Sequence, residues 1–182
     1  FRPAGPYLPS SGTLPLGQVV TCGRAPMYVD ADAGGRNNGL TWANAFTSLQ
    51  DGLALARLCP VMGELWVASG VYTPGVTADI AFRVTSGMQL YGGFAATETL
   101  RTQRDWVGNV TVLSGDIGRD DIKDANGVVT TTTNIVGTNS IHVLWLDGVT
   151  GAPITTTTRI DGITVSAGKA NGDHGGGLYC AG

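Results

Sequence analysis

A cluster of aspartates in the middle of the chain has the residue types that bind a cation or act on a glycosidic bond. It comprises Asp116, Asp120, Asp121 and Asp124, with Arg119 and Lys123 between them. Hydrolysis of a glycosidic bond uses two carboxylates that flank the scissile bond, and calcium prefers carboxylate oxygens. Because all four aspartates fall in one short segment, the sequence favours a solvated, turn-forming loop, and it assigns no catalytic residue.

A second acidic segment begins at the end of a short strand predicted over residues 27–30. Asp30 and Asp32 precede Gly34-Gly35, and Asn37 and Asn38 follow it. These oxygen donors suit calcium, although the spacing lacks the glutamate that completes an EF-hand loop. Asx turns explain the composition equally well. We therefore name five candidate ligands of a structural calcium ion, and the sequence indicates no other cofactor: Asp30, Asp32, Asp116, Asp120 and Asp121.

The three cysteines leave two interpretations open. In an oxidising compartment, Cys22 and Cys59 can form a disulfide that ties the N-terminal segment to the end of a predicted helix. Cys180 would then be free or paired with another chain. The alternative is three buried free thiols. The spacings match no zinc-binding pattern.

Composition excludes several classes of protein. The 182 residues carry a net charge of −3, and the 11 lysines and arginines form no cluster, so the phosphate contacts of a nucleic-acid-binding protein are not expected. No apolar run approaches the roughly 20 residues that span a bilayer. The 28 glycines and the low charged fraction of 14% fit a β-rich extracellular protein with many tight turns.

Short β-prone runs recur along the chain and must position these side chains. They begin at Leu65, Gln89, Thr111, His142 and Gly162, and each is closed by Gly, Ser, Asp or Thr. A repeat of about twenty-two residues with one strand per turn is typical of a β-solenoid. The alternation of Phe82 and Val84, then Met88 and Leu90, predicts which side chains point inward.

One helix is predicted, over residues 41 to 57. Thr41 has the properties of an N-cap, and apolar residues from Trp42 to Ala56 recur at helical spacing. Cys59-Pro60 ends the pattern. Because this helix precedes the repeating strands, we expect it to cap the first coil of the solenoid.

The first residues have a different composition. An extended, proline-rich arm is predicted over residues 1–26, with the folded domain over residues 27–182. Near the C-terminus, Gly-Gly-Gly-Leu-Tyr at 175–179 looks like the start of another coil with an exposed edge. Apolar side chains of the arm and of this edge are the predicted assembly residues: Tyr7, Leu8, Leu14, Leu16, Val19, Val20, Leu178 and Tyr179.

Several motifs occur in an order that resembles a known family. They include Tyr-Val-Asp-Ala-Asp at 28–32, Leu-Trp-Val-Ala-Ser-Gly at 65–70, Leu-Ser-Gly-Asp at 113–116 and Asp-Gly-Ile-Thr-Val at 161–165. Together they are similar to the N-terminal part of bacterial secreted, pectin-lyase-like proteins with a right-handed parallel β-helix. The final Gly-Gly-Gly-Leu-Tyr resembles repeats of polymorphic outer-membrane proteins. The resemblance spans about residues 27–182, and implies an all-β, right-handed parallel β-helix with an N-terminal capping α-helix.

The same resemblance implies a secreted or cell-surface location. Its members include adhesins, autotransporter passengers and polysaccharide lyases, which hold calcium with carboxylates beside an arginine base. Our first hypothesis is a non-enzymatic cell-surface structural protein that self-associates head to tail into filaments or a surface layer. The second is the N-terminal fragment of a larger adhesin or autotransporter passenger with a glycan or host-surface ligand. A polysaccharide lyase or hydrolase is the third.

Overall fold

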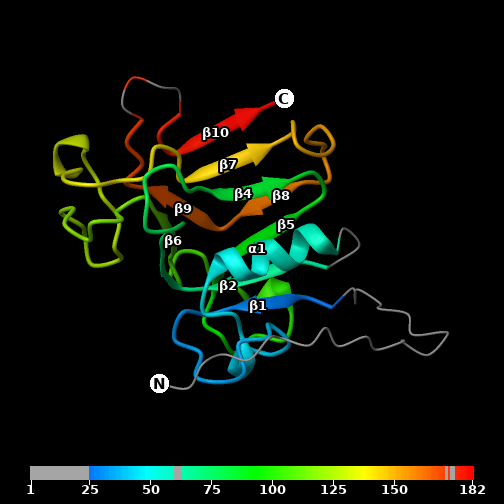
Figure 1. Ribbon diagram of the computed structural model, residues 1–182. Helices are drawn as coiled ribbons and strands as arrows, with labels where there is room; N and C mark the ends of the chain where they lie inside the picture. Colours follow the sequence, from blue (N-terminus) through cyan, green and yellow to red (C-terminus); the bar gives the residue numbers. More distant parts are fainter. Residues whose placement is uncertain (1–24, 60–62, 171, 173–174) are drawn as a thin grey trace, which may run out of the picture.

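The computed structural model describes residues 25–59, 63–170, 172 and 175–182. This part of the chain holds ten short strands, one α-helix and three 3-10 helices (Figure 1). The strands are β1 (Met27–Val29), β2 (Leu65–Ala68), β3 (Gly70–Tyr72), β4 (Phe82–Thr85), β5 (Gln89–Phe94), β6 (Thr111–Ser114), β7 (Leu144–Asp147), β8 (Arg159–Asp161), β9 (Ile163–Ser166) and β10 (Leu178–Ala181). The helices are α1 (Leu49–Leu58), η1 (Trp42–Asn44), η2 (Arg101–Gln103) and η3 (Thr132–Asn134).

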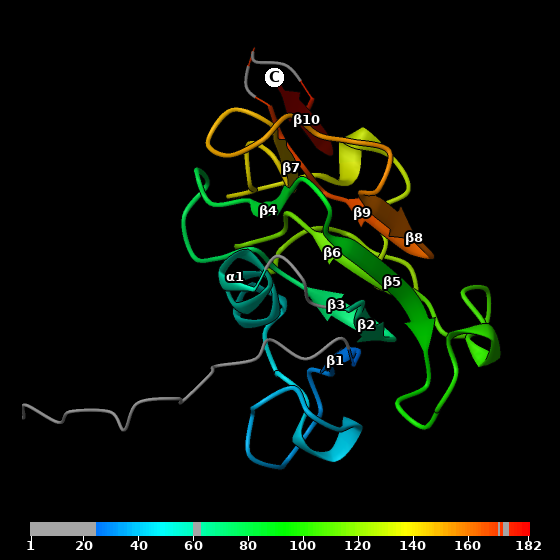
Figure 2. The same cartoon turned by 90° about the vertical axis from the view of Figure 1, so that its right-hand side faces the viewer.

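The strands form three small parallel sheets. Their orders are β1-β2-β5-β8, β3-β6-β9 and β4-β7-β10. The sheets surround a common apolar core. Their strands lie in successive levels between β1 and β10 (Figures 1 and 2). Each sheet therefore has one edge strand on the side away from β1: β8, β9 and β10 respectively.

The predicted fold class is wrong, because the chain is not an all-β, right-handed parallel β-helix capped by a helix. The structure is 28% strand and 12% helix, and its strands form three separate small sheets. The segments predicted as one repeating strand are divided among these sheets: β2 and β5 in the first, β6 and β9 in the second, β7 in the third. Strands that are evenly spaced in the sequence thus belong to different sheets, so their spacing is not the length of one turn.

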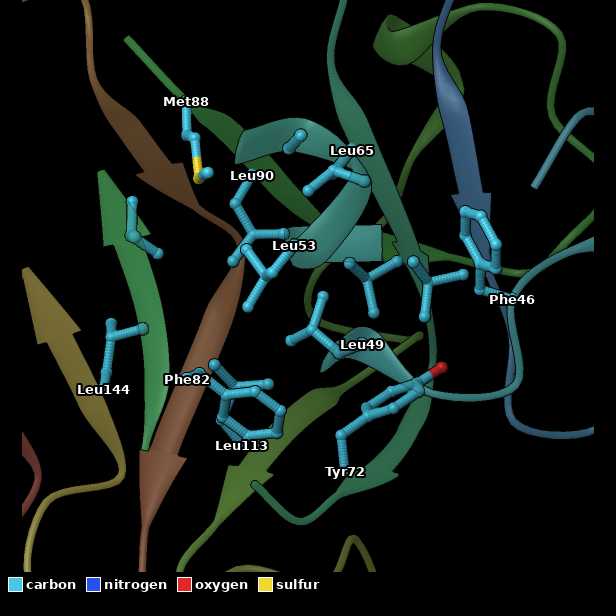
Figure 3. Packing of buried hydrophobic residues seen from close by; sticks show 14 of the residues in the cluster. Phe46, Leu49, Leu53, Leu65, Tyr72, Phe82, Met88, Leu90, Leu113 and Leu144 are labelled. Carbon is cyan, nitrogen blue, oxygen red and sulfur yellow. The ribbon is translucent and has the colours of Figure 1, made fainter. Parts of the chain in front are cut away.

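The main core is made by inward-facing side chains of all three sheets. Phe82 and Val84 of β4 are buried, and so are Met88 and Leu90, which confirms the predicted alternation. Leu113 of β6 contributes from the second sheet, and the cluster continues to Tyr72 (Figure 3). Burial of these side chains supplies the driving force that holds three sheets of such short strands together.

Helix α1 belongs to this core. Ser48 is its N-cap, with its side-chain oxygen accepting a hydrogen bond from the backbone N–H of Gln50. Leu49 and Leu53 are at most 1% exposed and lie among the core side chains of the sheets (Figure 3). The helix packs against β4 and β1. One face of the helix therefore belongs to the core, and its opposite face is exposed to solvent.

The first part of the predicted helix has another structure. Thr41 caps only the single turn of η1, its hydroxyl accepting a hydrogen bond from Asn44 N–H at 3.2 Å. Phe46 then forms a parallel bridge with Val29, so its backbone extends the edge of β1. The predicted helix over 41–57 is thus replaced by η1, an extended segment and α1.

A second, aromatic cluster lies on the outer face of the first sheet. Trp66 stacks on Phe94 with ring centroids 4.8 Å apart, and Tyr28 meets the edge of Trp66 at 5.7 Å. Trp42 packs against both Tyr28 and Phe94. These side chains hold the segments 30–46 and 95–106 onto the sheet.

Candidate functional site

One end of the strand levels has open edges. The outer sides of β8, β9 and β10 have no strand partner among the described residues, and no backbone hydrogen bond crosses the outer sides of β8 and β9 there. All three strands lie on the side away from β1 (Figure 2). Unpaired edges of this kind are templates for adding a further strand.

The predicted assembly residues Leu178 and Tyr179 lie on this open end. Leu178 is 49% exposed. The ring of Tyr179 stacks on His142 at 4.6 Å and meets the edge of Trp145 at 5.1 Å, while Arg83 covers Trp145 at 4.3 Å. The outer face of the third sheet is therefore a short aromatic ladder that ends at the exposed edge of β10.

The opposite end of the first sheet is closed by its own chain. The N–H of Tyr28 donates to the carbonyl of Gly39 at 3.0 Å, and Phe46 and Tyr28 are joined by a hydrogen bond of 2.9 Å. The segment 39–46 thus covers the outer side of β1. Within the described part of the chain the two ends therefore differ: segment 39–46 covers one, and the other presents strand edges without a partner.

The structure brings three predicted calcium ligands together. One carboxylate oxygen from each of Asp116, Asp120 and Asp121 lies within 4.8 Å of the others. Asp116 and Asp121 are buried and Asp120 is exposed. The cluster sits where the chain leaves β6 and enters the long segment 117–139.

Protein groups already satisfy the buried carboxylates. Asp116 accepts hydrogen bonds from the N–H of Asp120 and from the ammonium of Lys123. Asp121 accepts from Val136 N–H at 2.7 Å and from the Asn139 amide at 2.7 Å. Lys123 supplies a positive charge beside Asp116, and the network ties both ends of segment 117–139 together. This favours the loop-forming interpretation, and calcium binding here stays a prediction.

The pH dependence of stability follows from Asp116. Burial opposes ionisation of its carboxyl, but the Lys123 ammonium and the N–H groups of Asp121 and Asp120 outweigh it and lower the Asp116 pKa. A lowered pKa contributes stability that is present above about pH 4 and is lost as the pH falls through the folded-state value. We expect Asp116→Asn to lower the free energy of unfolding at pH 7 and to flatten the decline of that free energy as the pH falls below about 4.

Urea unfolding across this pH range measures the effect. Asp32→Asn is the matched control, because the exposed Asp32 carboxylate accepts no hydrogen bond from the described residues. Equal pH profiles for the two variants would contradict the role assigned to the Asp116–Lys123 pair.

Asp30 and Asp32 lie apart from this cluster, after β1. They border an open hollow of about 580 Å³ together with Gly34, Gly35 and Trp42. Asp30 accepts a hydrogen bond from the N–H of Asp32 at 3.0 Å, as in an Asx turn. The five predicted ligands therefore form two separate groups.

A groove that was not predicted from the sequence lies on the outer face of the first sheet. It is an open hollow of about 410 Å³ lined by Gln89 and Tyr91 of β5, Arg159 and Asp161 of β8, and Arg101 and Arg104. Gln89 pairs with Arg159 and Tyr91 with Asp161 across the two strands, so the four side chains share one face. Alternation within β5 and β8 could have shown that these four side chains share a face. It gives no indication that Arg101 and Arg104 fold over that face.

Two of the groove's arginines are held by neighbouring groups. Arg104 forms an ion pair with Asp161 at 2.9 Å and lies 5.1 Å from the ring centres of both Tyr91 and Trp106. Arg101 is paired with Glu64 and lies over Tyr91 at 4.6 Å. Arg159 is exposed and forms no ion pair with the described residues.

Two of the three cysteines, Cys59 and Cys180, lie among the described residues. Cys59 is disulfide-bonded, and Cys180 on β10 is an exposed free thiol. Cys22 lies outside the described residues, so the Cys22–Cys59 pairing stays a prediction. Most of the predicted arm also lies outside them, including Tyr7, Leu8, Leu14, Leu16, Val19 and Val20.

Comparison with family models, with curated proteins and with solved structures found no match to this chain. In the part of the chain that the structure covers, α1 is the longest helix, and no helix there has the length and apolar character needed to cross a membrane.

Proposed function

We propose that this protein is a secreted, structural component of a cell surface that associates with copies of itself. The observation that carries the proposal is the asymmetry of its ends. Among the described residues, the outer edges of β8, β9 and β10 have no strand partner at one end, and segment 39–46 covers β1 at the other. A disulfide at Cys59 suits an oxidising, extracellular compartment.

The proposed occupant of the open end is the N-terminal arm of a neighbouring copy. Because β1 is already covered, the closed end of one molecule cannot simply continue the sheets of the next. Residues 1–26 can supply an added strand, since prolines favour extended backbone and Leu14 and Leu16 are spaced to face one side. Leu178 would lose solvent exposure under such a strand. Each copy would donate one arm and receive another, a head-to-tail contact that builds filaments.

Two variants of the full chain test this proposal. Leu14→Asp/Leu16→Asp places charges in the arm, and Leu178→Lys places one at the receiving edge. We expect either change to weaken self-association by about tenfold or more, because a charge would be buried in an apolar contact. Sedimentation velocity and electron microscopy measure the association, and circular dichroism checks the fold. Deletion of residues 1–23 should abolish assembly in the same way.

Val76→Lys is the matched control, because Val76 is an apolar side chain that is 83% exposed in the connection between β3 and β4 and belongs to none of the open edge strands. It should assemble like the unmodified chain. Assembly that survives the arm changes would remove the arm from the proposal. Dispersed monomers of the unmodified chain would favour the second hypothesis, in which following segments of a larger adhesin or passenger domain pair with β8, β9 and β10.

A further inference from the structure

We propose that the segment following β6 binds one calcium ion between three carboxylates and one side-chain amide: Asp116, Asp120, Asp121 and Asn139. The site uses no residue of β8, β9 or β10, and it does not rest on the self-association proposed above. It keeps three of the five ligands predicted from the sequence. Asn139 is a ligand that the sequence did not indicate.

The three carboxylates lie at the separation that a single ion requires. One carboxylate oxygen from each of Asp116, Asp120 and Asp121 lies within 4.8 Å of the others. Calcium–oxygen distances are about 2.3–2.6 Å, so two ligands on opposite sides of one ion lie about 5 Å apart. The three oxygens can therefore bind the same ion.

The charge in the cluster favours a divalent cation. The ammonium of Lys123 pairs with Asp116, which leaves the carboxylates of Asp120 and Asp121 without a cationic partner among the described residues. Two further cations lie nearby in sequence or space, Arg119 and Lys169, but both are exposed and neither forms an ion pair in the described part of the chain. One calcium ion would balance the two remaining negative charges.

Asp120 is the carboxylate whose position most needs a cation. It accepts no hydrogen bond from the described residues, although it lies beside two other carboxylates that repel it. Two glycines leave room for it there: a Cβ at Gly118 would lie 2.6 Å from its Oδ1, and a Cβ at Gly137 would overlap its Oδ2. A bound cation would turn this repulsion into attraction.

A buried oxygen without a partner lies beside the same carboxylates. Asn139 is 5% exposed and pairs with Asp116 in an antiparallel bridge, so the two side chains lie on one face. Its Nδ2 donates to Asp121 at 2.7 Å, whereas its Oδ1 is buried and accepts no hydrogen bond from the described chain. Buried acceptors nearly always have a partner, and side-chain amide oxygens are ligands of calcium. Asn139 Oδ1 is therefore the fourth protein ligand.

This set of oxygens suits calcium better than magnesium. Calcium takes about six to eight oxygens, amide oxygens included, in variable geometry, whereas magnesium requires a nearly ideal octahedron. Because Asp120 is exposed, water can supply the remaining ligands. The positive charge of Lys123 beside the site opposes binding, so we expect a Kd of about 10⁻⁴–10⁻³ M, as in extracellular calcium-binding modules.

Calorimetric titration of the full chain with calcium chloride tests the site. Asp120→Asn should weaken calcium binding by about tenfold or more, because it removes a charged ligand. This variant should fold, since the Asp120 carboxylate accepts no hydrogen bond that the change could break. Without calcium, its thermal unfolding midpoint should equal or exceed that of the unmodified chain, because the repulsion is relieved. With calcium, the order should reverse.

Asp124→Asn is the matched control. It removes the same charge from an exposed carboxylate of the same segment that bonds only to the N–H groups of Asn126 and Val128. Its calcium affinity should stay within about twofold of that of the unmodified chain, because Asp124 contributes no ligand. Equal calcium affinities of Asp120→Asn and Asp124→Asn would overturn the site.

Limited digestion with trypsin gives a second measurement. Calcium should slow cleavage after Arg119 and Lys123, because the ion would tie Asp116 to Asn139 at the two ends of segment 117–139, and Asp120→Asn should abolish this protection. Cleavage after the exposed Arg36 should be unchanged. An unmodified chain that shows neither heat of binding nor protection at about 10 mM calcium chloride, above the expected Kd, would overturn the proposal. Equal protection by magnesium chloride would overturn the assignment to calcium.

Discussion

Leu53→Ala is expected to lower the free energy of unfolding by about 2–5 kcal/mol. Leu53 is completely buried between α1 and the strands of the sheets (Figure 3). Alanine would remove three methyl or methine carbons and leave a cavity that short strands on several sides can fill only in part. The loss is large compared with the roughly 5–15 kcal/mol that stabilises a typical domain. Urea unfolding followed by circular dichroism measures it.

Leu58→Ala on the same helix is the control. Leu58 is 78% exposed, so its replacement should change the free energy of unfolding by no more than about 0.5 kcal/mol. The difference between the two variants measures how far α1 belongs to the core. Equal effects would show that the buried face of α1 contributes nothing to the stability of the core.

Gly93→Ala is expected to lower the free energy of unfolding by at least about 1–3 kcal/mol, the usual cost of a strained backbone. Gly93 has a φ of +92°, which L side chains rarely adopt. An added Cβ would lie 2.7 Å from Trp106 Cα and 2.8 Å from its backbone nitrogen. The chain must then move at β5 or at the segment that carries Arg104, so the groove should be altered as well.

Thermal unfolding and tryptophan fluorescence report this change. Gly34→Ala is the matched control, because nothing lies within 4 Å of an added Cβ there and its φ lies outside the left-handed region. We expect it to leave the unfolding midpoint nearly unchanged. A Gly93→Ala protein as stable as Gly34→Ala would contradict the close packing of β5 against Trp106.

The sequence located most strands but not their sheets. The β-prone runs that begin at Leu65 and Thr111 coincide with β2 and β6, and those near His142 and Gly162 lie within two residues of β7 and β9. Alternation of side chains shows which residues face inward, but it carries no information on which of three sheets a strand joins. Because the loops between strands differ in length, strands of different sheets recur at similar intervals and resemble a single repeat.

The helix was misplaced because apolar spacing does not report where backbone hydrogen bonds go. Trp42, Ala45 and Phe46 have helical spacing, yet the backbone of Phe46 forms a bridge and a hydrogen bond with the edge of β1. Trp42 likewise faces the aromatic cluster instead of the core. Ser48, which does cap α1, lies inside the apolar pattern, where a cap is hard to recognise.

The candidate sites were predictable only where their residues are close in the sequence. Asp116, Asp120 and Asp121 are close in sequence, so their proximity was predictable, whereas the hydrogen bonds from Val136 and Asn139 that occupy Asp121 come from the far end of a long segment. The arginine groove joins residues from η2 to β8 that only the sheet brings together. The hydrogen bonds to Asp121 and the lining of the groove both depend on tertiary contacts, which could not be predicted from the sequence.

The parallel pairing of all three sheets has a kinetic consequence. No two of the described strands form a hairpin. Even the paired strands that are nearest along the chain join Leu65 to Leu90, and Gln89 pairs with Arg159. A chain whose contacts are this distant in sequence pays a large entropic cost before its first strands pair, and such topologies refold on timescales of milliseconds to seconds or longer. Until β8 and β9 have paired, the edges of β5 and β6 remain exposed to other chains. Refolding yield should therefore fall steeply as protein concentration rises, because another chain can take the place of the missing strand.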